Sequence, residues 1–570
     1  MTDAPEAIWQ VLPGNPEIEE LFVRELSVPP LIARLLVQRG FTSAEVADRF
    51  LNPKLDHLNS PRLLPDFEPA VAAILGAKER NEVVYVHGDY DVDGVSSTAI
   101  FTRFLRRIGM NIIPHVPHRM EEGYGIHMDA VKWAKEHGTD LFLTCDCGVL
   151  AFEQVDAINE LGMRAVITDH HSMGDRLPNA VAVVNPHRDD SKYPYPDLAG
   201  AGVVFQLCAG ISEALGVPIG RFHRAFLDLA VLGTISDVMP LTGDNRVISK
   251  FGLEQLRTTQ KIGLQELKRV SGINGNRPMT ATDIGFKIGP RINAVGRIDD
   301  AAIALDLFLS DDRNEAMQLA ETMDRVNQER RDQQAQMIDE AVAIVEESGQ
   351  SNAKCITVAK EGWHPGIVGI VAGKIAEKYY RPAIVIAIDG DEARASARSI
   401  PAFHIGNVIS KARDTGVAIM GGGHAEAAGM SIHVDRIEEF KTLFSEMAES
   451  LKQEDLIPQI TCNGVLDLED ADVRTAALLH QLEPYGMANP KPLFALHGVG
   501  IQETKLTASG EHVQFTAADG PYMVKGIAFG MADSLADKQG CELDLAAELE
   551  LNEWNGVSSP KLVLKSFRLG

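Results

Sequence analysis

Three apolar, strand-like runs in the first third of the chain each end in acidic or imidazole side chains. Residues 83–86 lead into His-Gly-Asp-Tyr-Asp-Val-Asp-Gly, residues 141–144 into Cys-Asp-Cys-Gly, and residues 165–168 into Asp-His-His. Helical segments separate the runs, and this alternation predicts a parallel sheet with right-handed crossovers. Because ligands bind beyond the carboxyl ends of the strands in such a sheet, we expect these side chains to converge on one site.

The side chains at these strand ends are of the types that bind hard divalent cations. Carboxylate oxygens with a few imidazoles suit Mg²⁺ or Mn²⁺, and enough of them are present for two ions. The predicted ligands are His87, Asp91, Asp93, Asp146, His170 and Asp237. Asp91 and Asp93 would share one face of an extended segment, and Asp146, from the middle motif, is the expected bridging ligand. A paired divalent site is typical of enzymes that hydrolyse phosphate esters.

Three neighbouring residues are predicted to act beside the ions. Asp89 and Asp169 would orient imidazole rings, a function that metal sites need, and His171 would contact the scissile phosphate. An isolated aspartate in a turn is usually a helix cap or a solvated charge. Acids at three strand ends, together with a histidine pair, are much harder to explain in that way.

Length, charge and cysteine content restrict the possible folds and partners. A single core is implausible for 570 residues, so three or four domains are expected. A net charge of −26 argues against a broad surface that coats nucleic acid, but it is compatible with a narrow basic channel. Six cysteines are too few for a disulfide framework. Cys145 and Cys147 are too close together for a zinc pair, so we expect them to be packing residues.

No stretch of the sequence is long and apolar enough to predict a transmembrane helix. The acidic N-terminus lacks the basic and then apolar pattern of a signal peptide. We therefore expect a cytoplasmic protein with no membrane partner.

Hydrophobic patterning divides the chain into five segments. Residues 1–75 are predicted to be a helical segment packed on the next domain, and residues 76–310 an α/β domain. Residues 311–348 contain no Gly or Pro, and their polar middle is typical of a long helix that bridges two domains through solvent. Two helices joined by a polar turn are the alternative. Residues 349–455 are predicted to be a smaller α/β domain, and residues 456–570 an OB-type β-barrel.

Several arginines, histidines and their neighbours are candidates for phosphate binding. Guanidinium groups suit phosphate oxygens, a strand would present Ser396 and Arg398 on one face, and amides after three glycines suit an anion near His424. A single arginine is as often a surface charge, and a core histidine is the alternative for His364. The candidates are Arg119, Arg291, Asn293, Arg297, His364, Ser396, Arg398 and His424.

In order and spacing, these motifs resemble the DHH phosphoesterase superfamily. The resemblance rests on Asp89–Gly94, Asp146, the triplet at 169–171 and Asp237 in Ser-Asp-Val-Met-Pro. Gly421–His424 with Ala428 and Gly429 is similar to the associated DHHA1 domain. The segments at 291–297 and 363–366, and Arg119 with the segment at 122–125, are similar to the bacterial exonucleases of this superfamily. The resemblance covers nearly the whole chain.

The resemblance implies an α/β fold in which a parallel-sheet DHH domain and a smaller DHHA1 domain are joined by a long helix and followed by an OB-fold. It implies a 5′→3′ exonuclease that uses two Mn²⁺ or Mg²⁺ ions on single-stranded DNA in recombinational and mismatch repair. Arg119, Ser396 and Arg398 would form a pocket for a terminal 5′-phosphate. The implied partners are single-strand DNA-binding protein and a RecQ-type helicase, and a monomer is expected.

Two alternatives to this exonuclease stay open at the level of the sequence. A DHH oligoribonuclease or small-nucleotide phosphatase would need only the two α/β domains, so the long helix and the β-rich tail count against it. A catalytically inactive DNA-binding scaffold would need a hidden defect, because the acids and histidines are all present.

Overall fold

The computed structural model describes residues 7–119, 121–123, 125–275, 277–554 and 556–569. Residues 1–6, on which the expectation about a signal peptide rests, lie outside the described residues. The chain forms two compact units. The first, here called the DHH unit, comprises Pro13–Asn327 and Ala477–Lys491, and the second, here called the tail unit, comprises the residues up to Leu12, Gln328–Ala476 and the residues from Pro492. No described helix has the length and apolar character needed to cross a membrane.

A five-stranded, wholly parallel sheet forms the centre of the DHH unit, with strand order β3-β2-β4-β5-β6. The strands are β2 (Val83–His87), β3 (Asn111–His115), β4 (Thr139–Thr144), β5 (Arg164–Thr168) and β6 (Ala182–Val184). The connecting helices are α5 (Val92–Arg107), α6 (Met128–Glu136) and α7 (Phe152–Glu160), and α4 (Phe67–Glu79) and α8 (Gly200–Ala214) flank the sheet segment in the chain. The parallel sheet is the architecture that the sequence predicted.

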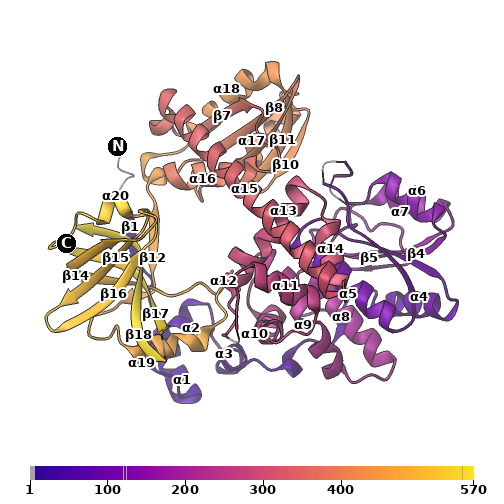
Figure 1. Ribbon diagram of the computed structural model, residues 1–570, viewed down its shortest axis with the longest axis horizontal. Coiled ribbons are helices and arrows are strands. Elements are labelled where there is room, and N and C mark those ends of the chain that lie inside the picture. Colours follow the sequence, from indigo (N-terminus) through magenta and orange to yellow (C-terminus); the bar gives the residue numbers. More distant parts are fainter. Residues whose placement is uncertain (1–6, 120, 124, 276, 555, 570) are drawn as a thin grey trace. The chain divides into compact units, whose positions relative to one another are not determined.

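Side chains alternate between two cores on the two faces of this sheet. Val84 and Leu143 pack into the larger core with α5 and α8, whereas Tyr85 and Phe142 pack with α6 and α7 on the other face. Figure 1 shows α6 and α7 on one side of the sheet and α4 on the opposite side. Because both faces are covered, the strands read as continuous apolar runs. Cys145 is fully buried in the larger core, as expected for a packing residue.

A second group of helices completes the DHH unit and contributes to its larger core. These elements are α9 (Ile219–Ser236), α10 (Gly243–Arg257), α11 (Ile262–Val270), α12 (Ala281–Asp283), the π-helix η3 (Ile284–Ile288), α13 (Gly289–Ile298) and α14 (Ala302–Leu309). Helices α5, α8 and α9 pack on one another. The first turns of α5 and α8 and the last turn of α9 lie at the acidic motifs.

The sequence predicted a helical N-terminal segment, but this segment is not helical throughout. Its helices are α1 (Pro16–Leu26), α2 (Pro30–Gln38) and α3 (Ala44–Leu51). A short strand precedes them, β1 (Ile8–Val11), and it pairs in parallel with β12 (Gln459–Cys462) of the tail unit. Four residues are too few for an alternating pattern to identify a strand. The partner of this strand also lies about 450 positions away in the sequence. The predicted domain boundaries otherwise stay predictions.

Residues 311–348 form one continuous helix, α15 (Arg313–Glu347), so the prediction of a single helix is confirmed over two helices with a turn. Met323 and Val326 are buried in the core of the DHH unit. Trp363 of the tail unit donates its indole N–H to Glu340 at 2.7 Å. The two ends of α15 thus belong to different units, and the division falls at Asn327, inside the polar middle.

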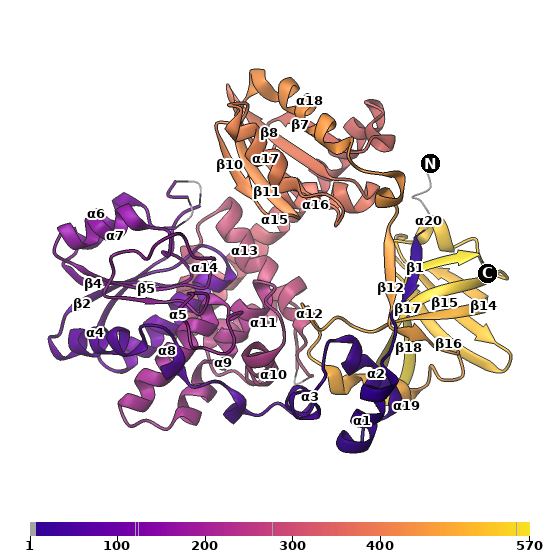
Figure 2. The ribbon, with the colours of Figure 1, turned by 180° about the vertical axis from the view of Figure 1, so that it is seen from behind.

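The tail unit begins after α15 with a five-stranded mixed sheet of order β10-β11-β9-β8-β7. The strands are β7 (Ile356–Glu361), β8 (Ala383–Asp389), β9 (Glu392–Arg398), β10 (Met420–Gly423) and β11 (Ala427–His433). The helices are α16 (Val368–Tyr379), α17 (Ile405–Asp414) and α18 (Ile437–Ala448). In Figure 2, α16 and α18 lie on opposite sides of this sheet. Alanines of β9 pack with α17 and α18.

A closed barrel completes the tail unit, because β14 pairs with both β15 and β17. Its strands are β14 (Leu493–Leu506), β15 (Val513–Asp519), β16 (Tyr522–Ala528), β17 (Glu542–Trp554) and β18 (Val557–Leu569). The cyclic order β14-β15-β16-β18-β17 is that of an OB-fold, which confirms the predicted class. The smaller elements are β13 (Gly464–Val465), α19 (Val473–Leu479) and α20 (Ala532–Leu535).

Candidate metal centre

The first acidic turn runs directly into α5. Asp91 caps this helix, since its Oδ1 accepts from the amides of Asp93 (2.9 Å) and Gly94 (3.0 Å). Asp93 lies in the first helical turn, so the expectation that Asp91 and Asp93 share an extended face was wrong. Instead, the carboxylate of Asp93 accepts from the amides of Gly200 (2.6 Å) and Ala201 (2.8 Å). These amides begin α8, and a helix N-terminus stabilises negative charge.

Asp146 takes a backbone conformation that is rare outside glycine, with φ of 63°. Such conformations cost free energy and cluster at functional sites. Two glycines make room for the acids: a Cβ on Gly200 would lie 2.7 Å from Asp146 Oδ1, and one on Gly233 would lie 2.2 Å from Asp93 Oδ1. The sequence analysis missed both glycines. A glycine-rich helix start at 199–202 was the available signal for the first of them.

His170 lies in the middle of the acidic cluster. Its Nε2 is 3.1 Å from Asp146 Oδ1, 3.6 Å from Asp237 Oδ2 and 3.8 Å from Asp93 Oδ2. A backbone hydrogen bond with Leu198 fixes the ring. Such a bond on one ring nitrogen orients the other toward a metal ion.

His171 faces a different partner. Its Nδ1 lies 2.8 Å from Asp169 Oδ1 and 4.0 Å from Asp146 Oδ1. Asp169 also accepts from the amides of His170 (2.7 Å) and His171 (3.0 Å), and from the amide of Val149 (3.0 Å). Asp169 is therefore a buried anchor for the histidine turn and orients the imidazole of His171.

Among the described residues, three overlapping groups of side chains could hold a metal ion. Within each group, the candidate ligand atoms all lie within 4.8 Å of one another. The groups are Asp146, His170 and His171; Asp93, His170 and Asp237; and Asp89, Asp91 and Asp146. Asp146 and His170 each belong to two groups, which is the arrangement that two adjacent ions need.

Two atoms in this cluster show that its residues fit a divalent ion. Asp146 Oδ1 and His170 Nε2 are both buried and lack a hydrogen-bond partner among the described residues, although they lie 3.1 Å apart. Adjacent ligands of an octahedral ion at about 2.1 Å are about 3.0 Å from each other. The orphaned pair therefore has the separation of two ligands on one Mg²⁺ or Mn²⁺.

The carboxylates of the cluster repel one another in a buried setting. Burial raises the pKa of Asp89 to about 8 and that of Asp237 to about 7, and the charge of Asp91 adds to both shifts. Burial and the neighbouring acids also raise the pKa values of Asp93 and Asp146. Bound cations would relieve this repulsion and keep the acids ionised.

The two imidazoles titrate in opposite directions. Burial, together with His171, lowers the pKa of His170 to about 4, so this ring is neutral as a metal ligand must be. Burial alone would lower the pKa of His171, but its hydrogen bond to Asp169 raises that pKa to about 9. At Asp169, burial raises the pKa of the carboxyl, but this bond, the charge of His171 and the backbone amides of His171 and Val149 together lower it below its ordinary value.

Two predicted site residues lie elsewhere than the sequence suggested. His87 is fully buried, its Nε2 lies 3.1 Å from the carbonyl oxygen of Gly125, and it joins none of the three groups found among the described residues. Asp89 was predicted to orient an imidazole, but it lies with Asp91 and Asp146. The turn from Asp89 to Gly94 is tight, since a Cβ on Gly94 would lie 2.4 Å from the carbonyl oxygen of Asp89. This turn brings the carboxylate of Asp89 close to that of Asp91.

Two predicted phosphate-binding arginines flank the tyrosine of the first acidic turn. The guanidinium of Arg119 lies 5.0 Å from the ring centroid of Tyr90. On α13, a Cβ on Gly296 would lie 2.6 Å from the carbonyl oxygen of Tyr90. Burial raises the pKa of Tyr90, and the positive charge of the next residue on α13, Arg297, partly offsets this rise. Asn293 lies one turn earlier on α13 and is half-buried. Arg119 and Arg297 therefore lie beside Tyr90, the residue between Asp89 and Asp91.

Arg291 has a structural environment that the sequence did not reveal. It is buried, forms an ion pair of 2.8 Å with Asp324 of α15, and donates to the carbonyl oxygens of Lys287 and Val270. Its hydrogen-bonding capacity is thus directed into the protein. The spacing of six residues between Arg291 and Arg297 placed them on different sides of α13.

Ser396 and Arg398 lie on one face of β9, as predicted, and both are half-buried. This face packs on α16, where a Cβ on Gly369 would lie 3.0 Å from Ser396 Oγ and 3.5 Å from Arg398 Nη2. Gly369 belongs to the first turn of α16. Arg398 donates to its neighbour's carbonyl oxygen at 2.8 Å and takes part in no ion pair within the described residues. Arg119 belongs to the DHH unit and these two residues to the tail unit.

The two remaining histidine candidates differ in environment. His364 Nδ1 accepts from the amide of Gly366 at 3.0 Å, which fixes the turn before α16. The three glycines before His424 form the edge strand β10 rather than the turn that the sequence suggested. The amide of exposed His424 donates to the carbonyl oxygen of Ala427 at 2.8 Å, so it is not available to an anion.

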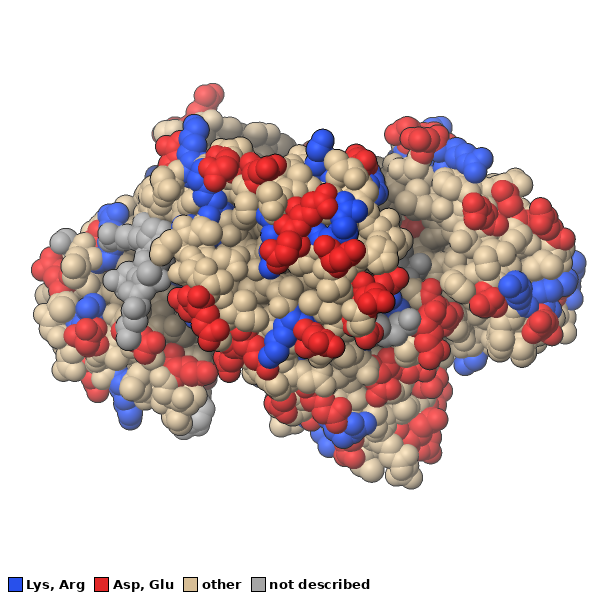
Figure 3. Space-filling model, turned by 90° about the horizontal axis from the view of Figure 1, so that it is seen from above, with Lys and Arg blue, Asp and Glu red and all other residues tan. Residues whose placement is uncertain are grey.

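Charged side chains on the surface agree with the composition. On the face drawn in Figure 3, acidic and basic groups are interspersed, and acidic groups cover the larger area. A broad basic surface is absent from that face. The basic residues considered above are therefore local features of an acidic protein.

Comparisons with known proteins identify the family. Residues 83–234 match the DHH family N-terminal domain, residues 352–450 the DHHA1 domain, and residues 462–566 the RecJ OB domain. The single-stranded-DNA-specific exonuclease RecJ of Bacillus subtilis is 36% identical over 562 residues, covering 98% of this chain and 70% of the relative. The chain belongs to the RecJ family. RecJ of Escherichia coli is 32% identical, with coverage of 96% of this chain and 97% of the relative.

Solved structures of RecJ proteins have the same fold. RecJ from Thermus thermophilus in complex with Mn²⁺ superposes with a TM-score of 0.85 at 30% identity, covering 100% of this chain and 80% of that one. An exonuclease RecJ bound to manganese gives a TM-score of 0.60 at 34% identity, covering 70% of this chain and 97% of that one. The family therefore contains proteins whose structures include the class of ion that the cluster fits.

Proposed function

We propose that the cluster around Asp146 and His170 hydrolyses phosphodiester bonds of single-stranded DNA with the aid of Mn²⁺ or Mg²⁺. The protein is an exonuclease of the RecJ family, and its relatives are named for specificity toward single-stranded DNA. The observation that carries the proposal is the orphaned pair of buried ligand atoms 3.1 Å apart among repelling carboxylates.

The three overlapping groups divide naturally between two ions. One would be held by Asp93, His170 and Asp237, and the other by Asp89 and Asp91, with Asp146 shared. Bound divalent ions activate water and stabilise the charge that develops on phosphate oxygens. In this assignment Asp89 is a ligand rather than an orienting group, and His87 supports the fold around the site instead of binding an ion.

The protein's own groups then position the substrate. Asp169 anchors His171, whose half-exposed ring would contact the scissile phosphate. Arg297 and Arg119, which border the cluster beside Tyr90, would hold adjacent phosphates, with Asn293 as a neutral contact. Arg291 is left out of this role, because its partners are inside the protein.

We further propose that Ser396 and Arg398 recognise the terminal 5′-phosphate and so set a 5′→3′ polarity. Metal ions alone cannot distinguish one phosphodiester from the next, whereas a terminal monophosphate carries additional charge. A half-buried guanidinium without a carboxylate partner, next to a hydroxyl and the first turn of α16, suits such a group. His364, which fixes the turn before α16, would support this site.

The proposed partners beyond DNA follow from family membership alone. They are single-strand DNA-binding protein and a RecQ-type helicase, each of which would present or produce single strands for recombinational and mismatch repair. We propose a monomer that acts in the cytoplasm, where the chromosomal DNA of bacteria such as the curated relatives lies.

One assay tests the proposed activity against its alternatives. DNA oligonucleotides labelled at the 5′ or the 3′ end, single- or double-stranded, are incubated with Mn²⁺ or with EDTA. Mn²⁺-dependent release of 5′-terminal nucleotides from single strands is the expected result. Activity on short RNA or small nucleotides, tested in parallel, without degradation of the DNA would favour an oligoribonuclease or small-nucleotide phosphatase. DNA binding without cleavage would favour an inactive scaffold.

A further inference from the structure

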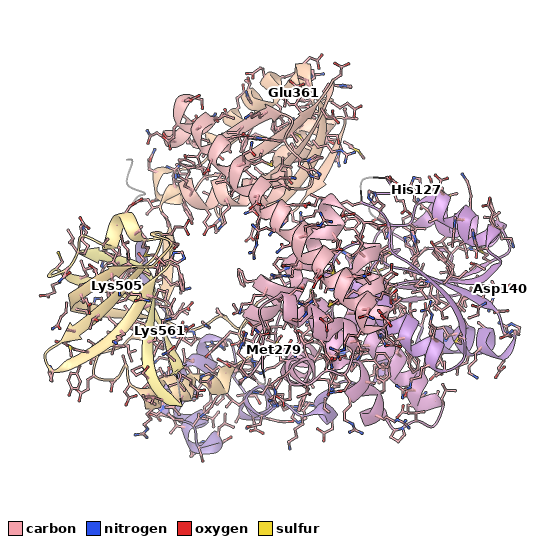
Figure 4. All side chains as sticks on the ribbon, viewed as in Figure 1. His127, Asp140, Met279, Glu361, Lys505 and Lys561 are labelled. Atoms are coloured by element: carbon pink, nitrogen blue, oxygen red, sulfur yellow. The ribbon has the colours of Figure 1, made fainter. Side chains whose placement is uncertain are left out.

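The loop between β3 and α6 carries Arg119, and none of the assignments above explains what fixes this loop. It belongs to the DHH unit, and of residues 116–127 the structure describes all but 120 and 124. Figure 4 labels His127, the residue that caps α6 at the end of the loop. Whatever fixes the loop also decides where the guanidinium of Arg119 lies.

Glu122 closes the turn on which Arg119 lies. Its Oε1 accepts from the amide of His118 at 2.8 Å, and its own amide donates to the carbonyl oxygen of His118, also at 2.8 Å. The amide of Glu121 donates to the same carbonyl oxygen at 3.2 Å. The side chain and the backbone of Glu122 thus both bind His118, the residue directly before Arg119.

The second carboxylate oxygen of Glu122 fastens this turn to the parallel sheet. Its Oε2 lies 3.1 Å from Nε2 of His115, the last residue of β3. The carbonyl oxygen of His115 accepts from the amide of Gly88 at 2.9 Å, and its ring stacks on that of Tyr85 with centroids 5.8 Å apart. Gly88 directly precedes Asp89, so the turn is anchored to the strand that leads into the first acidic motif.

A second histidine holds the loop on the other side of Arg119. Nε2 of His87 lies 3.1 Å from the carbonyl oxygen of Gly125, and the rings of His87 and His115 are 5.3 Å apart. Burial and the charge of His115 lower the pKa of His87 to about 4, so the neutral ring can donate to this carbonyl. Two imidazoles at the ends of β2 and β3 therefore hold the loop before and after Arg119.

The bonds of Glu122 also keep its charge away from Arg119. Burial would raise the pKa of Glu122, but its hydrogen bonds with His115 and with the amide of His118 hold that pKa at about 2, so the group is a carboxylate at neutral pH. Arg119 lies over the ring of Tyr90 and takes part in no ion pair within the described residues. Because a carboxylate paired with Arg119 would compete with a phosphate, this arrangement leaves the guanidinium available.

We propose that Glu122, fastened by His115, is a positioning residue that holds Arg119 at the first acidic turn, where its guanidinium binds a DNA phosphate. The inference deepens the proposed function and rests on it, because it requires Arg119 to be a phosphate contact. It also predicts the sign of an effect. Removing a carboxylate beside a bound polyanion strengthens binding if charge alone matters, whereas loss of the position of Arg119 weakens binding.

The test measures binding separately from cleavage. A labelled, 5′-phosphorylated oligo(dT) is titrated with the full-length protein in EDTA over a range of salt concentrations. Arg119→Ala should weaken binding about tenfold, the loss expected for one charge-assisted contact, and should lower the slope of log K against log salt by about 0.7. Glu122→Ala should change both quantities in the same direction. Glu121→Ala removes the same charge from an exposed neighbour and is the matched control, which should bind as tightly as the wild type or more tightly.

A double variant shows whether Glu122 acts through Arg119. With Arg119→Ala already present, Glu122→Ala should change the Kd and kcat/KM by less than about twofold, because coupled residues are not additive. Glu122→Gln retains an acceptor for the amide of His118 and should recover most of the lost affinity. Mn²⁺ affinity, measured by calorimetry, should be unchanged in every variant. If Glu122→Ala does not fold, His115→Ala replaces it in both backgrounds, since it cuts the tie to the sheet and leaves the turn closed.

The outcomes separate this inference from the proposed function. Equal losses from Glu122→Ala with and without Arg119 would overturn the inference, as would a loss of Mn²⁺ affinity or binding as tight as that of Glu121→Ala. If Arg119→Ala binds DNA like the wild type, the phosphate contact of Arg119 is wrong and the inference fails with it. A wild-type protein that binds DNA but does not cleave it would overturn the proposed activity, and the titrations in EDTA would still decide the function of Glu122.

Discussion

At the scale of single residues, the chemistry depends on buried groups that have no partner within the protein. Asp146 and His170 present orphaned atoms to each other, and the strained backbone of Asp146 persists because the helices around it fix that geometry. Such strain and desolvation would be selected against in a purely structural turn. The expectation is that these residues contribute to activity and little to stability.

Asp146→Ala should abolish cleavage, lowering kcat at least a hundredfold, because the carboxylate shared by two ligand groups is lost and several kcal/mol of charge stabilisation are lost with it. The melting temperature without metal should stay the same or rise, since one member of a repelling cluster is removed. Turnover, bound Mn²⁺ and oligonucleotide binding in EDTA are measured together. Substantial Mn²⁺-dependent turnover in the folded variant would contradict the assignment.

Two arginines on α13 should separate stability from activity. Arg291→Ala leaves Asp324 without its ion pair and removes three hydrogen bonds, so we expect a loss of about 1–3 kcal/mol in the free energy of unfolding. Arg297→Ala should lower kcat/KM with little change in melting temperature, because this residue borders the metal cluster. Urea denaturation and single-strand cleavage are compared for both variants. The opposite pattern would restore Arg291 as the phosphate contact.

Arg398→Ala should reduce the preference for 5′-phosphorylated over 5′-hydroxyl strands. One charge-assisted contact is worth about 1–3 kcal/mol, which corresponds to a change of roughly tenfold in the ratio of kcat/KM for the two substrates. Arg394→Ala, on the same strand but exposed, is the matched control. An unchanged ratio would remove Arg398 from the 5′-phosphate site, and equal degradation from 3′ ends by the wild type would refute the polarity.

At the scale of secondary structure, helix starts supply what the sequence motifs alone do not. The acids follow strands β2, β4 and β5, but α8 donates two amides to Asp93 and two glycines leave room for the carboxylates. A small helix residue can thus matter as much as a ligand. This dependence is testable without touching any charged group.

Gly233→Ala should impair metal binding and catalysis, because its Cβ would lie 2.2 Å from Asp93 Oδ1 and must displace that carboxylate. Gly220→Ala on the same helix is the control, since the nearest atom to its Cβ is an arginine tip at 3.9 Å. The control should keep full activity and gain up to about 1 kcal/mol of stability. Calorimetric titration with Mn²⁺ and turnover distinguish them, and normal metal affinity in Gly233→Ala would show that Asp93 is not a ligand.

At the scale of the whole molecule, each compact unit is built from stretches that are separated in the sequence. Residues 477–491 interrupt the barrel segment of the sequence yet belong to the DHH unit. There Arg39 donates to Asn489 and the carbonyl oxygen of Pro490, and Arg246 donates to the carbonyl oxygens of Leu482 and Glu483. Burial lowers the pKa of Arg39 to about 10 and that of Arg246 to about 9.

Deleting the chain from Thr461 onward should therefore damage the DHH unit itself. Two buried guanidinium groups would lose acceptors, at about 1–3 kcal/mol each, in addition to the lost barrel. We expect a lower melting temperature and reduced kcat. A truncated protein as stable and active as the full chain would show that residues 477–491 do not support the DHH unit.

Local patterns were sufficient for much of this structure. Apolar runs that end in acids predicted the parallel sheet, since β2, β4 and β5 are buried on both faces, and the absence of Gly and Pro predicted α15. The same runs predicted the acids and His170 of the metal cluster, because the carboxyl ends of parallel strands meet at one edge. These inferences need only periodicity and the chemistry of the side chains.

Other features depended on contacts between residues distant in sequence, which no local pattern encodes. Arg291 and Arg297 differ in environment because α15 supplies Asp324 to Arg291. His87 lies beside the motif acids but its ring meets Gly125, and β1 finds its partner in β12. Residue type and spacing thus determined what the site contains, whereas packing decided which side of each element faces it, because burial and charge partners exist only in the folded chain.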